Sequence, residues 1–372
     1  MGIETYNIPC GRLPRGPHNL ITDVAGVRVG HATIHEGNNH TGVTVILPSE
    51  GVADRSSNVF KDKLVAAAYV HNGYGKTLGT VQIQELGTLE TPIALTNTLN
   101  VGLVHNALVG YTLEKCAVDG TSCRSVNAVV GECNDSSLND IGNRVVTAEH
   151  VKKAIETADV EFEEGCVGAG TSTLCYGFKG GIGSASRVIE IGDRQYTIGV
   201  LVQSNYGSTK DFVVNGRSVG EEVIAMLEDG KRPEARPEAE KNDETMGGHF
   251  VPAQVDKGSI MTVIATDLPV TSRQLERIAR RAGAGLARTG SFIGHGSGEI
   301  MLAFSTANVI RDEEPFMDVK AVREDLLDLA FRAVAEATNE AVLSSMLHAK
   351  TAYGLNGRVW YSLADFELFE ER

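Results

Sequence analysis

The sequence lacks several features that would place it at once in a class of protein. No apolar run approaches the roughly 18 residues that a membrane-spanning helix needs, so we expect no membrane partner. Residues 1–7 hold neither a basic region nor an apolar stretch, so no signal peptide is visible. Cationic residues are in the minority, with 34 Lys and Arg against 48 Asp and Glu, and the formal net charge is −14. That balance argues against nucleic acid as the main partner.

Familiar metal and cofactor motifs are missing as well. The six cysteines form no C-x-x-C pair, and without an export signal we expect free thiols in a reducing cytoplasm. The histidines are scattered and no H-E-x-x-H occurs, so we expect no metal site. The glycine-dense residues 168–183 fit neither the P-loop nor the dinucleotide-binding fingerprint. We interpret this segment as a close-packed bend beside a pocket.

What is present is the composition of an ordinary soluble protein, with 42% hydrophobic residues, 22% charged residues and 41 glycines. Strands are predicted over residues 41–48, 259–266, 300–304 and 359–363, with a hairpin of residues 186–191 and 196–202. Helices are predicted from Asn97 to Tyr111, from Thr147, over 220–227, over 273–288 behind the cap Thr271, and within 318–349. Strands come in pairs and helices in blocks, which favours an α+β fold over a doubly wound sheet.

The bond between Gly258 and Ser259 is the first candidate for chemistry. It joins a polar, Pro-rich stretch, with a predicted linker at residues 228–242, to the apolar run 259–266. Cleavage there would give Ser259 a free α-amine beside its own hydroxyl, so that one residue holds a nucleophile and its base. Glycine tolerates the unusual conformation that such cleavage requires. Alone, the pair also suits an ordinary turn before a strand.

Three further constellations carry polar side chains at the ends of predicted strands. Ser297 and Glu299 stand two residues apart, so within a strand they share a face, and a carboxylate can orient a hydroxyl. His295 beside them is an alternative general base. Asn205 ends a strand and offers an amide N–H to an oxyanion. Glu132, also at a strand end, can pair with a substrate ammonium. Each motif alone is equally typical of a turn.

Together these pieces resemble the L-aminopeptidase/D-esterases of the DmpA type and the β-peptidyl aminopeptidases, the self-processing serine aminopeptidases of peptidase family S58. The resemblance runs nearly from end to end. Its markers are Ile21-Thr-Asp-Val-Ala-Gly-Val-Arg-Val-Gly-His31, Val129-Val-Gly-Glu-Cys-Asn-Asp135, Leu138-Asn-Asp140, Gly168-Ala-Gly-Thr171, Gly177-Phe-Lys-Gly-Gly-Ile-Gly183, Val202-Gln-Ser-Asn205, Gly258-Ser259, Ala265-Thr-Asp267 and Ser297-Gly-Glu299.

The resemblance implies an architecture and a precursor. The expected fold is an αββα sandwich like that of the N-terminal-nucleophile hydrolases, with a different connectivity. A single domain of residues 1–372 would cut itself after Gly258 into chains 1–258 and 259–372, which stay together. The family habit suggests a homotetramer.

The resemblance also implies residue roles. Ser259 is the expected nucleophile, assisted by Ser297 and Glu299, while Asn205 donates to the oxyanion and Glu132 binds the free amine of a small peptide, amino-acid amide or ester. No cofactor is expected, because the protein supplies every role. The proton acceptor stays open between the α-amine of Ser259 and the Ser297–Glu299 pair. The preference among α-, β- and D-configured substrates is also open.

Two other functions remain as alternatives. The first is an acyltransferase of the ornithine acetyltransferase kind, whose nucleophile is a threonine exposed by the same type of cleavage. Serine at position 259 counts against it. The second is a protein that keeps the fold but only binds or regulates. The complete set of five polar site residues argues against that reading.

Overall fold

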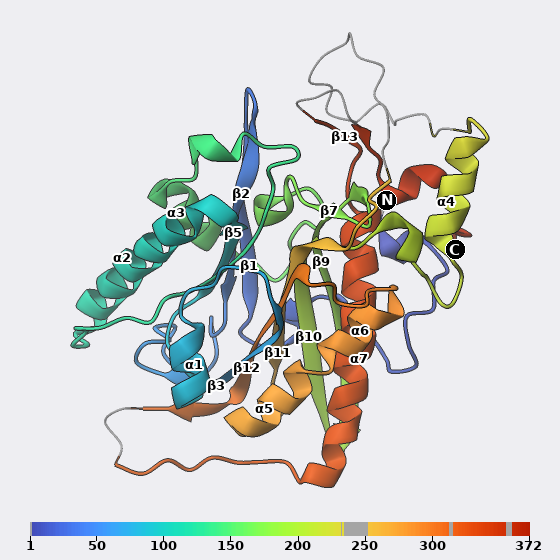
Figure 1. The fold of residues 1–372 in the computed structure, drawn as a ribbon. Coiled ribbons are helices and arrows are strands. Elements are labelled where there is room, and N and C mark those ends of the chain that lie inside the picture. Colours follow the sequence, from blue (N-terminus) through green and yellow to red (C-terminus); the bar gives the residue numbers. More distant parts are fainter. Residues whose placement is uncertain (1, 232, 234–251, 312–314, 355–358) are drawn as a thin grey trace.

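Two β-sheets lie face to face between two outer layers of helices (Figure 1). The computed structural model describes residues 2–231, 233, 252–311, 315–354 and 359–372. The α-helices are α1 (Thr80–Leu86), α2 (Val101–Asp119), α3 (Ala148–Glu156), α4 (Val219–Glu228), α5 (Ser272–Ala279), α6 (Ala282–Arg288) and α7 (Leu327–Leu347). Two short strand pairs lie outside the main sheets, β7 (Leu174–Cys175) with β8 (Phe178–Lys179) and β13 (Ala352–Tyr353) with β14 (Val359–Trp360).

The smaller sheet has four strands in the order β1-β2-β5-β6. They are β1 (Arg28–Glu36), β2 (Asn39–Leu47), β5 (Ile93–Asn97) and β6 (Val129–Cys133). β5 and β6 run parallel and are joined through α2, while the other pairs are antiparallel. Helices α2 and α3 cover the outer face, where Val43 and Val45 of β2 belong to one apolar cluster with Val104 and Leu108 of α2.

The larger sheet has six strands in the order β4-β3-β12-β11-β10-β9. They are β3 (Lys63–Gly73), β4 (Thr88–Leu89), β9 (Gly181–Ile191), β10 (Arg194–Asn205), β11 (Lys257–Thr266) and β12 (Gly296–Ile310). β11 and β12 are parallel and joined through α5 and α6. Helix α7 packs across β9 and β10 on the outer face. The two parallel crossovers account for the helical blocks seen in the sequence.

Strand β11 is buried on both faces, which explains its unbroken apolar sequence. Ile260 and Ile264 pack against the helices of the outer layer. Met261, Val263 and Ala265 face the smaller sheet. The strand therefore sits at the centre of the sandwich, and its first residues open toward the end of β6.

The layers match the predicted αββα sandwich, and several predicted elements are confirmed. The hairpin is formed by β9 and β10, and its two-residue turn begins at Gly192, whose φ of 66° favours glycine. Helix α4 covers the predicted residues 220–227. Thr271 caps α5, because its hydroxyl accepts a hydrogen bond from the Gln274 N–H at 3.3 Å.

The predicted helix over residues 273–288 is wrong in one respect, because the structure divides it into α5 and α6. The bend brings two glycines of α6 into close contact with neighbouring elements. A Cβ on Gly285 would lie 2.6 Å from the Thr338 Cβ of α7, and one on Gly283 would lie 2.7 Å from the His71 ring. Tertiary contact thus overrides the helical periodicity of the sequence.

Three other boundaries differ from the prediction. Helix α2 begins at Val101 rather than Asn97, because the Asn97 side chain accepts from the Asn100 N–H and caps a short 3-10 turn. Within 318–349 the structure has one helix, α7, which begins only at Leu327. The strand predicted at 359–363 is only two residues long, because Ser362 caps a 3-10 turn that follows it.

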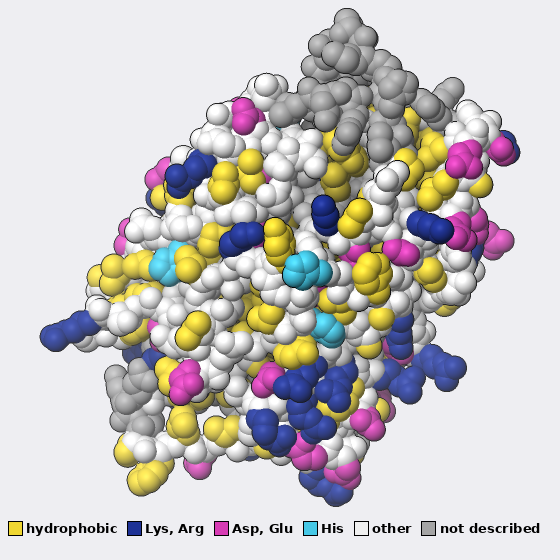
Figure 2. Space-filling model, in the orientation of Figure 1, with side chains coloured by type: hydrophobic (Ala, Val, Ile, Leu, Met, Phe, Trp, Pro, Cys, Tyr) yellow, Lys and Arg dark blue, Asp and Glu magenta, His cyan; other side chains and the backbone are white. Residues whose placement is uncertain are grey.

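An arginine-rich patch covers α5 in the lower half of the face shown in Figure 2. Its cations have acidic partners: Arg273 and Arg277 both bind Glu324, and Arg280 binds Glu276 at 2.5 Å. These three arginines therefore form a surface of paired charges.

The predicted linker at residues 228–242 lies almost entirely outside the described residues, beyond the end of α4 at Glu228. Within the described part of the chain, no helix combines the length and the apolar character that crossing a membrane requires.

Candidate active site

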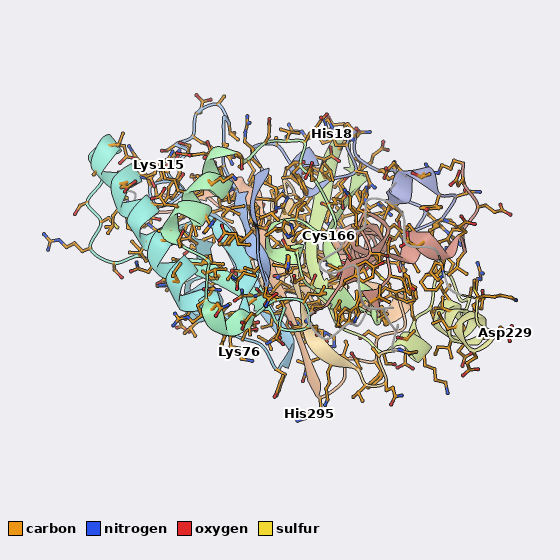
Figure 3. The ribbon with its side chains drawn as sticks, turned by 90° about the horizontal axis from the view of Figure 1, so that it is seen from above. His18, Lys76, Lys115, Cys166, Asp229 and His295 are labelled. Atoms are coloured by element: carbon orange, nitrogen blue, oxygen red, sulfur yellow. The ribbon has the colours of Figure 1, made fainter. Side chains whose placement is uncertain are left out.

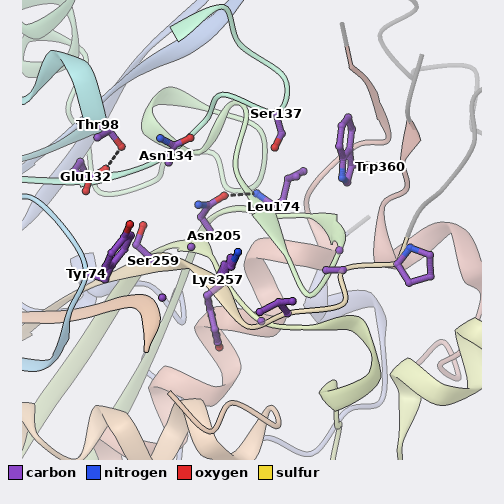
Figure 4. A pocket seen from close by; sticks show the side chains of 18 of the residues that line it. Tyr74, Thr98, Glu132, Asn134, Ser137, Leu174, Asn205, Lys257, Ser259 and Trp360 are labelled. Carbon is purple, nitrogen blue, oxygen red and sulfur yellow. Dashed lines mark hydrogen bonds between the residues drawn. The ribbon is translucent and has the colours of Figure 1, made fainter. Parts of the chain in front are cut away.

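A pocket of about 450 Å³ opens where β6, β10 and β11 come together (Figure 4). Three of the polar residues singled out from the sequence line it, namely Ser259, Asn205 and Glu132. They come from three strands of two different sheets. The remaining wall is formed by Tyr74, Lys76, Thr98, Asn134, Ser137, Leu174, Gly177, Tyr206, Gly207, Pro252, Ala253, Val255, Lys257, Gly258, Gly296 and Trp360.

Gly258 lies inside β11 rather than before it, since the strand begins at Lys257, and Ser259 lies within the strand as predicted. Gly258 has φ of +129°, a conformation that residues with a Cβ rarely adopt. A Cβ there would also lie 1.9 Å from the backbone carbonyl oxygen of Asn205. Only glycine fits this position. Ser259 is 3% exposed, and the pocket reaches it.

Asn205 ends β10 directly opposite Ser259 in the antiparallel register. Its Oδ1 accepts a hydrogen bond from the Leu174 N–H at 2.9 Å, which fixes the side-chain amide (Figure 4). The Nδ2 atom then lies beside the scissile residue, 3.3 Å from where a Cβ on Gly258 would be. Nδ2 is therefore placed to donate to an oxygen that develops negative charge at residue 258.

Glu132 lies in β6, on the opposite wall of the pocket from β11 (Figure 4). It is 3% exposed. Its Oε1 accepts from the Lys76 backbone N–H at 2.9 Å, and its Oε2 accepts from the Thr98 hydroxyl. No cation pairs with this carboxylate among the salt bridges of the described residues. A buried, oriented carboxylate of this kind suits a substrate ammonium.

Ser297 and Glu299 lie on the neighbouring strand, β12, but outside the pocket lining. The strand begins at Gly296, so the two side chains share one face, as the sequence predicts. In the register, Ser259 lies beside Gly298. Alternation then turns Ser259 toward the smaller sheet, and Ser297 and Glu299 toward the helices. The structure thus places this pair on the far side of the scissile peptide.

The Ser297–Glu299 pair is fully buried. Burial raises the pKa of Glu299 from 4.5 to about 7; the nearby Ser297 hydroxyl opposes this, and the negative charge of Asp256 adds to it. Within the described residues, neither the Ser297 Oγ nor the Glu299 oxygens have a hydrogen bond of good geometry. A carboxyl group with such a pKa exchanges its proton near neutral pH.

His295, the alternative base, is not brought into the site. It is exposed at the edge of the molecule in Figure 3 and does not line the pocket. Its ring lies 6.4 Å from that of Tyr74, between centroids.

The glycine-dense residues 168–183 form a close-packed bend beside the pocket, as interpreted from the sequence. A Cβ on Gly170 would lie 2.4 Å from the Ile182 nitrogen, and Leu174 and Gly177 line the pocket.

Two polar residues beside the site, the buried Asp256 and the half-buried Asn72, are not predicted from the sequence. Asp256 accepts hydrogen bonds from the backbone N–H groups of Gly207 and Gly294. Asn72 of β3 donates to the carbonyl oxygens of Gly294 and His295 at 3.0 and 3.2 Å. Asn72 precedes Gly73 and Asp256 lies two residues before Gly258, and a polar residue near a glycine also suits an exposed turn. Nothing in the local sequence separates the two cases.

Comparison with known proteins now identifies the family. The model of peptidase family S58 matches residues 19–360. Two curated relatives are both named β-peptidyl aminopeptidase BapA. The one from Sphingosinicella xenopeptidilytica is 37% identical over 95% of this chain and 86% of its own length, and the one from Sphingosinicella microcystinivorans is 38% identical over 95% and 87%.

Solved structures agree over almost the whole chain. The PH0078 protein of Pyrococcus horikoshii OT3 matches with a TM-score of 0.86 and 43% identity, covering 99% of this chain and 97% of that one. A β-aminopeptidase of a Burkholderia species gives 0.84 and 36%, with the same coverage. The L-aminopeptidase D-Ala-esterase/amidase of Ochrobactrum anthropi, described as a prototype serine aminopeptidase and a variant of the Ntn-hydrolase fold, gives 0.82 and 33%, covering 97% and 95%.

The chain belongs to peptidase family S58. It is a hydrolase, and its fold is that of the Ntn-hydrolase variant of the serine aminopeptidases. The family membership favours hydrolysis of peptide, amide or ester bonds over the acyltransferase and the binding protein that the sequence left as alternatives.

Proposed function

We propose that this chain is a precursor that cuts its own Gly258–Ser259 bond and then uses Ser259 to release N-terminal amino acids from small peptides, amides and esters. The observation that supports this most strongly is the meeting of Ser259, Asn205 and Glu132 in one pocket. A nucleophile, an oxyanion donor and an ammonium anchor are the three groups that an aminopeptidase without a metal requires.

Self-cleavage begins with an acyl shift. The Ser259 Oγ attacks the carbonyl carbon of Gly258, the C–N bond to Ser259 breaks, and an ester forms while the nitrogen gains a proton. Water then hydrolyses the ester, leaving the Gly258 carboxylate, the Ser259 hydroxyl and a free α-amine. The positive φ of Gly258 and the adjacent Asn205 amide support this step, because they hold the peptide in an unusual conformation next to a hydrogen-bond donor.

The two candidate proton carriers take different roles in this scheme. In the uncut chain, Ser259 has no α-amine. Ser297 lies beside Gly258 in the strand register, and Glu299 follows on the same helix-facing side of β12, beside Ile260. With a pKa of about 7, Glu299 is able to protonate the departing nitrogen. In the cut protein, the new α-amine has a reference pKa of about 7.7–8.0 and takes the proton from the Oγ, while Ser297 and Glu299 hold that amine in place.

The working cycle then follows from the pocket. Glu132 binds the substrate ammonium, and the Ser259 Oγ attacks the carbonyl carbon of the first substrate residue. Asn205 Nδ2 donates to the oxyanion, a contribution of roughly 3 kcal/mol in acyl-transfer enzymes. The α-amine passes its proton to the leaving amine or alcohol. Water releases the amino acid from the acyl-enzyme and restores the hydroxyl.

Substrate preference, assembly and compartment complete the proposal. The relatives named β-peptidyl aminopeptidase and β-aminopeptidase lead us to include β-aminoacyl substrates beside α- and D-aminoacyl ones. We also propose a homotetramer, on the family resemblance alone. A cytoplasmic location is supported by the six cysteines, all of which are free in the structure.

The test is the chain pattern of three purified proteins. The wild type should give two chains of 258 and 114 residues, which follow from cleavage of the 372-residue chain after Gly258. Ser259→Ala should stay whole, whereas Ser305→Ala, a buried serine at the far end of the same sheet, should be cut normally. Cleavage of Ser259→Ala after Gly258 would remove Ser259 from the mechanism.

Substrate assays separate the enzyme alternatives. Release of p-nitroaniline from α-, β- and D-aminoacyl p-nitroanilides is expected, and it should depend on the free amine of the substrate. Acetyl transfer to an amino acid, without amide hydrolysis, would favour the acyltransferase instead.

A further inference from the structure

Asp256 occupies an unusual place, one residue before β11 and two before the scissile glycine. Its side chain is buried, with 5% exposure. Oδ1 accepts a hydrogen bond from the Gly207 N–H at 3.1 Å, and Oδ2 accepts one from the Gly294 N–H at 3.0 Å. Both donors belong to the backbone of other segments. Each carboxylate oxygen therefore holds a different loop.

The first loop is the one that presents the oxyanion donor. Gly207 comes two residues after Asn205, at the end of β10. Its φ is +92°, and a Cβ there would lie 2.4 Å from the Tyr176 ring. The chain thus turns sharply as soon as it leaves the site. The bond from Gly207 to Asp256 fixes where that turn lies relative to β11.

The second loop leads into the strand of Ser297 and Glu299. Just before Gly294, Ile293 has φ of +59°, a strained conformation that is rare for a β-branched residue. Such a conformation persists only where the surroundings impose it. The hydrogen bond from the Gly294 N–H to Asp256 holds the peptide that follows Ile293. The Ser297 N–H in turn donates to the Gly294 carbonyl oxygen at 3.0 Å.

The segment of Asp256 is anchored a second time upstream. The Thr209 N–H donates to the Ala253 carbonyl oxygen at 2.8 Å, and the Ala253 N–H donates to the Thr209 hydroxyl at 2.8 Å. These bonds and the one from the Gly207 N–H to Asp256 lie within residues 1–258, whereas the bond from the Gly294 N–H joins that part of the chain to residues 259–372. Cleavage after Gly258 breaks none of them, so the segment remains in place in the cut protein.

We propose that Asp256 is a positioning residue that clamps the Asn205 turn and the loop before Ser297 against the two sides of the Gly258–Ser259 bond. This inference rests on the proposed self-cleavage. The clamp is a carboxylate because two acceptors must face two N–H donors at once. A space-filling residue would not need two acceptors. The proposal therefore predicts that removing one acceptor and the charge, with the shape unchanged, has an effect that a packing role does not predict.

The variant Asp256→Asn keeps the shape and removes one acceptor. One backbone N–H then faces the NH₂ group of the amide, and a hydrogen bond to a charged group is lost. We expect self-cleavage of freshly purified precursor to slow by about 10- to 100-fold. The fraction that does mature should show a lower kcat with KM within about twofold of the wild type, because Glu132 is untouched.

Asp267→Asn is the matched control. Asp267 lies one residue after the other end of β11, and its Oδ1 accepts the Thr197 N–H at 2.7 Å. It is thus a comparable carboxylate bound to backbone, remote from the scissile bond. This variant should cleave at the wild-type rate. Equal slowing in both variants would mean a general loss of stability, and would overturn the proposal.

A double variant gives a rescue that a packing role does not predict. Glycine adopts φ of +59° without strain, so Ile293→Gly removes the cost that Asp256 offsets. Asp256→Asn combined with Ile293→Gly should therefore cleave several-fold faster than Asp256→Asn alone. A double variant that is no faster would contradict the clamp.

Hydrogen exchange of the wild type provides a test that needs no variant. The Gly207 and Gly294 amides should exchange slowly, and fast exchange at either would contradict the proposal even if Asp256→Asn fails to fold.

Different results would refute the proposed self-cleavage and the proposed role of Asp256. An uncut wild type would refute self-cleavage itself, whereas a cut wild type with Asp256→Asn cleaving equally fast would refute only the role of Asp256.

Discussion

Two groups of buried carboxylates lie on the helix-facing side of the larger sheet, and they differ in their partners. Beneath α7, Glu340 binds Arg187 of β9 at 2.5 Å and Arg15 at 2.7 Å, and Glu336 lies 3.5 Å from the Arg187 guanidinium. On β12, Glu299 is equally buried but has no cation beside it among the described residues, and no hydrogen bond of good geometry.

The difference shows two uses of a buried charge. In the Arg187 cluster, the guanidinium and the carboxylates compensate each other, so removing one member leaves a buried charge alone. Glu299 has no such compensation, and a pKa raised to about 7 suits the proton-carrier role proposed for it. The first arrangement contributes to stability, and the second is suited to catalysis at the expense of stability.

The largest expected effect concerns Glu299→Gln. The amide keeps the shape but has no acidic proton for the departing nitrogen and no charge to hold the α-amine of Ser259, so self-cleavage and kcat should fall by about 10²- to 10⁴-fold. The folded state should be as stable as the wild type or more so, because a buried ionisable group is removed. Rates from gel densitometry and melting by circular dichroism measure both. A variant that stays active but is less stable would mean that Glu299 contributes to stability, as the carboxylates of the Arg187 cluster do, and would contradict its role in catalysis.

Next in size is Glu340→Gln in the paired cluster. It should lower the free energy of unfolding by about 3–5 kcal/mol, because Arg187 and Arg15 lose a buried partner. Cleavage and kcat should be nearly unchanged below the melting temperature. Denaturant unfolding of the variant, with the exposed pair variant Glu324→Gln as control, tests this. A large loss of kcat in a folded Glu340→Gln protein would show that the Arg187 cluster also serves catalysis, and would contradict the difference drawn between it and Glu299.

Another buried carboxylate, Glu132, sharpens the comparison because it has hydrogen bonds but, among the described residues, no cation beside it. Glu132→Ala should raise KM by about 10- to 100-fold for substrates with a free amine, through loss of a charge-assisted hydrogen bond. The neighbouring Asp135→Asn is the control, since Asp135 binds Thr41 and Asn139 away from the pocket. An unchanged KM in Glu132→Ala would remove its assigned role.

The smallest effect is a dependence of stability on pH. Burial raises the pKa of Glu299 from 4.5 to about 7, so the folded protein keeps a proton that the unfolded chain has released. Stability from this group is therefore lost as the pH rises from about 4.5 to 7. Melting curves of Ser259→Ala and Ser259→Ala/Glu299→Gln should diverge across that window, with the second variant more stable at pH 7. Parallel curves would contradict the raised pKa.

Much of the fold could be predicted because local pattern and tertiary role agree. The apolar run of β11 and the turn at Gly192 both appear in the structure where the sequence places them. The break between α5 and α6 could not be predicted, because the close approach of Gly285 to α7 is a contact between residues distant in sequence.

The candidate site was predicted in part for the same reason. Strand ends marked Asn205, Glu132 and Ser259, and the structure gathers these in one pocket. That Ser297 and Glu299 face away from it depends on the register between β11 and β12, which no local motif encodes. Asp256 could not be predicted, because its carboxylate accepts hydrogen bonds from two backbone N–H groups, those of Gly207 and Gly294, which are distant from it in sequence.

The most direct measurement is the intact mass, with N-terminal sequencing, of purified and active protein. The account predicts two chains in equal amounts, the smaller one of 114 residues beginning with Ser259. Full activity residing in one unbroken polypeptide of 39.7 kDa would contradict it.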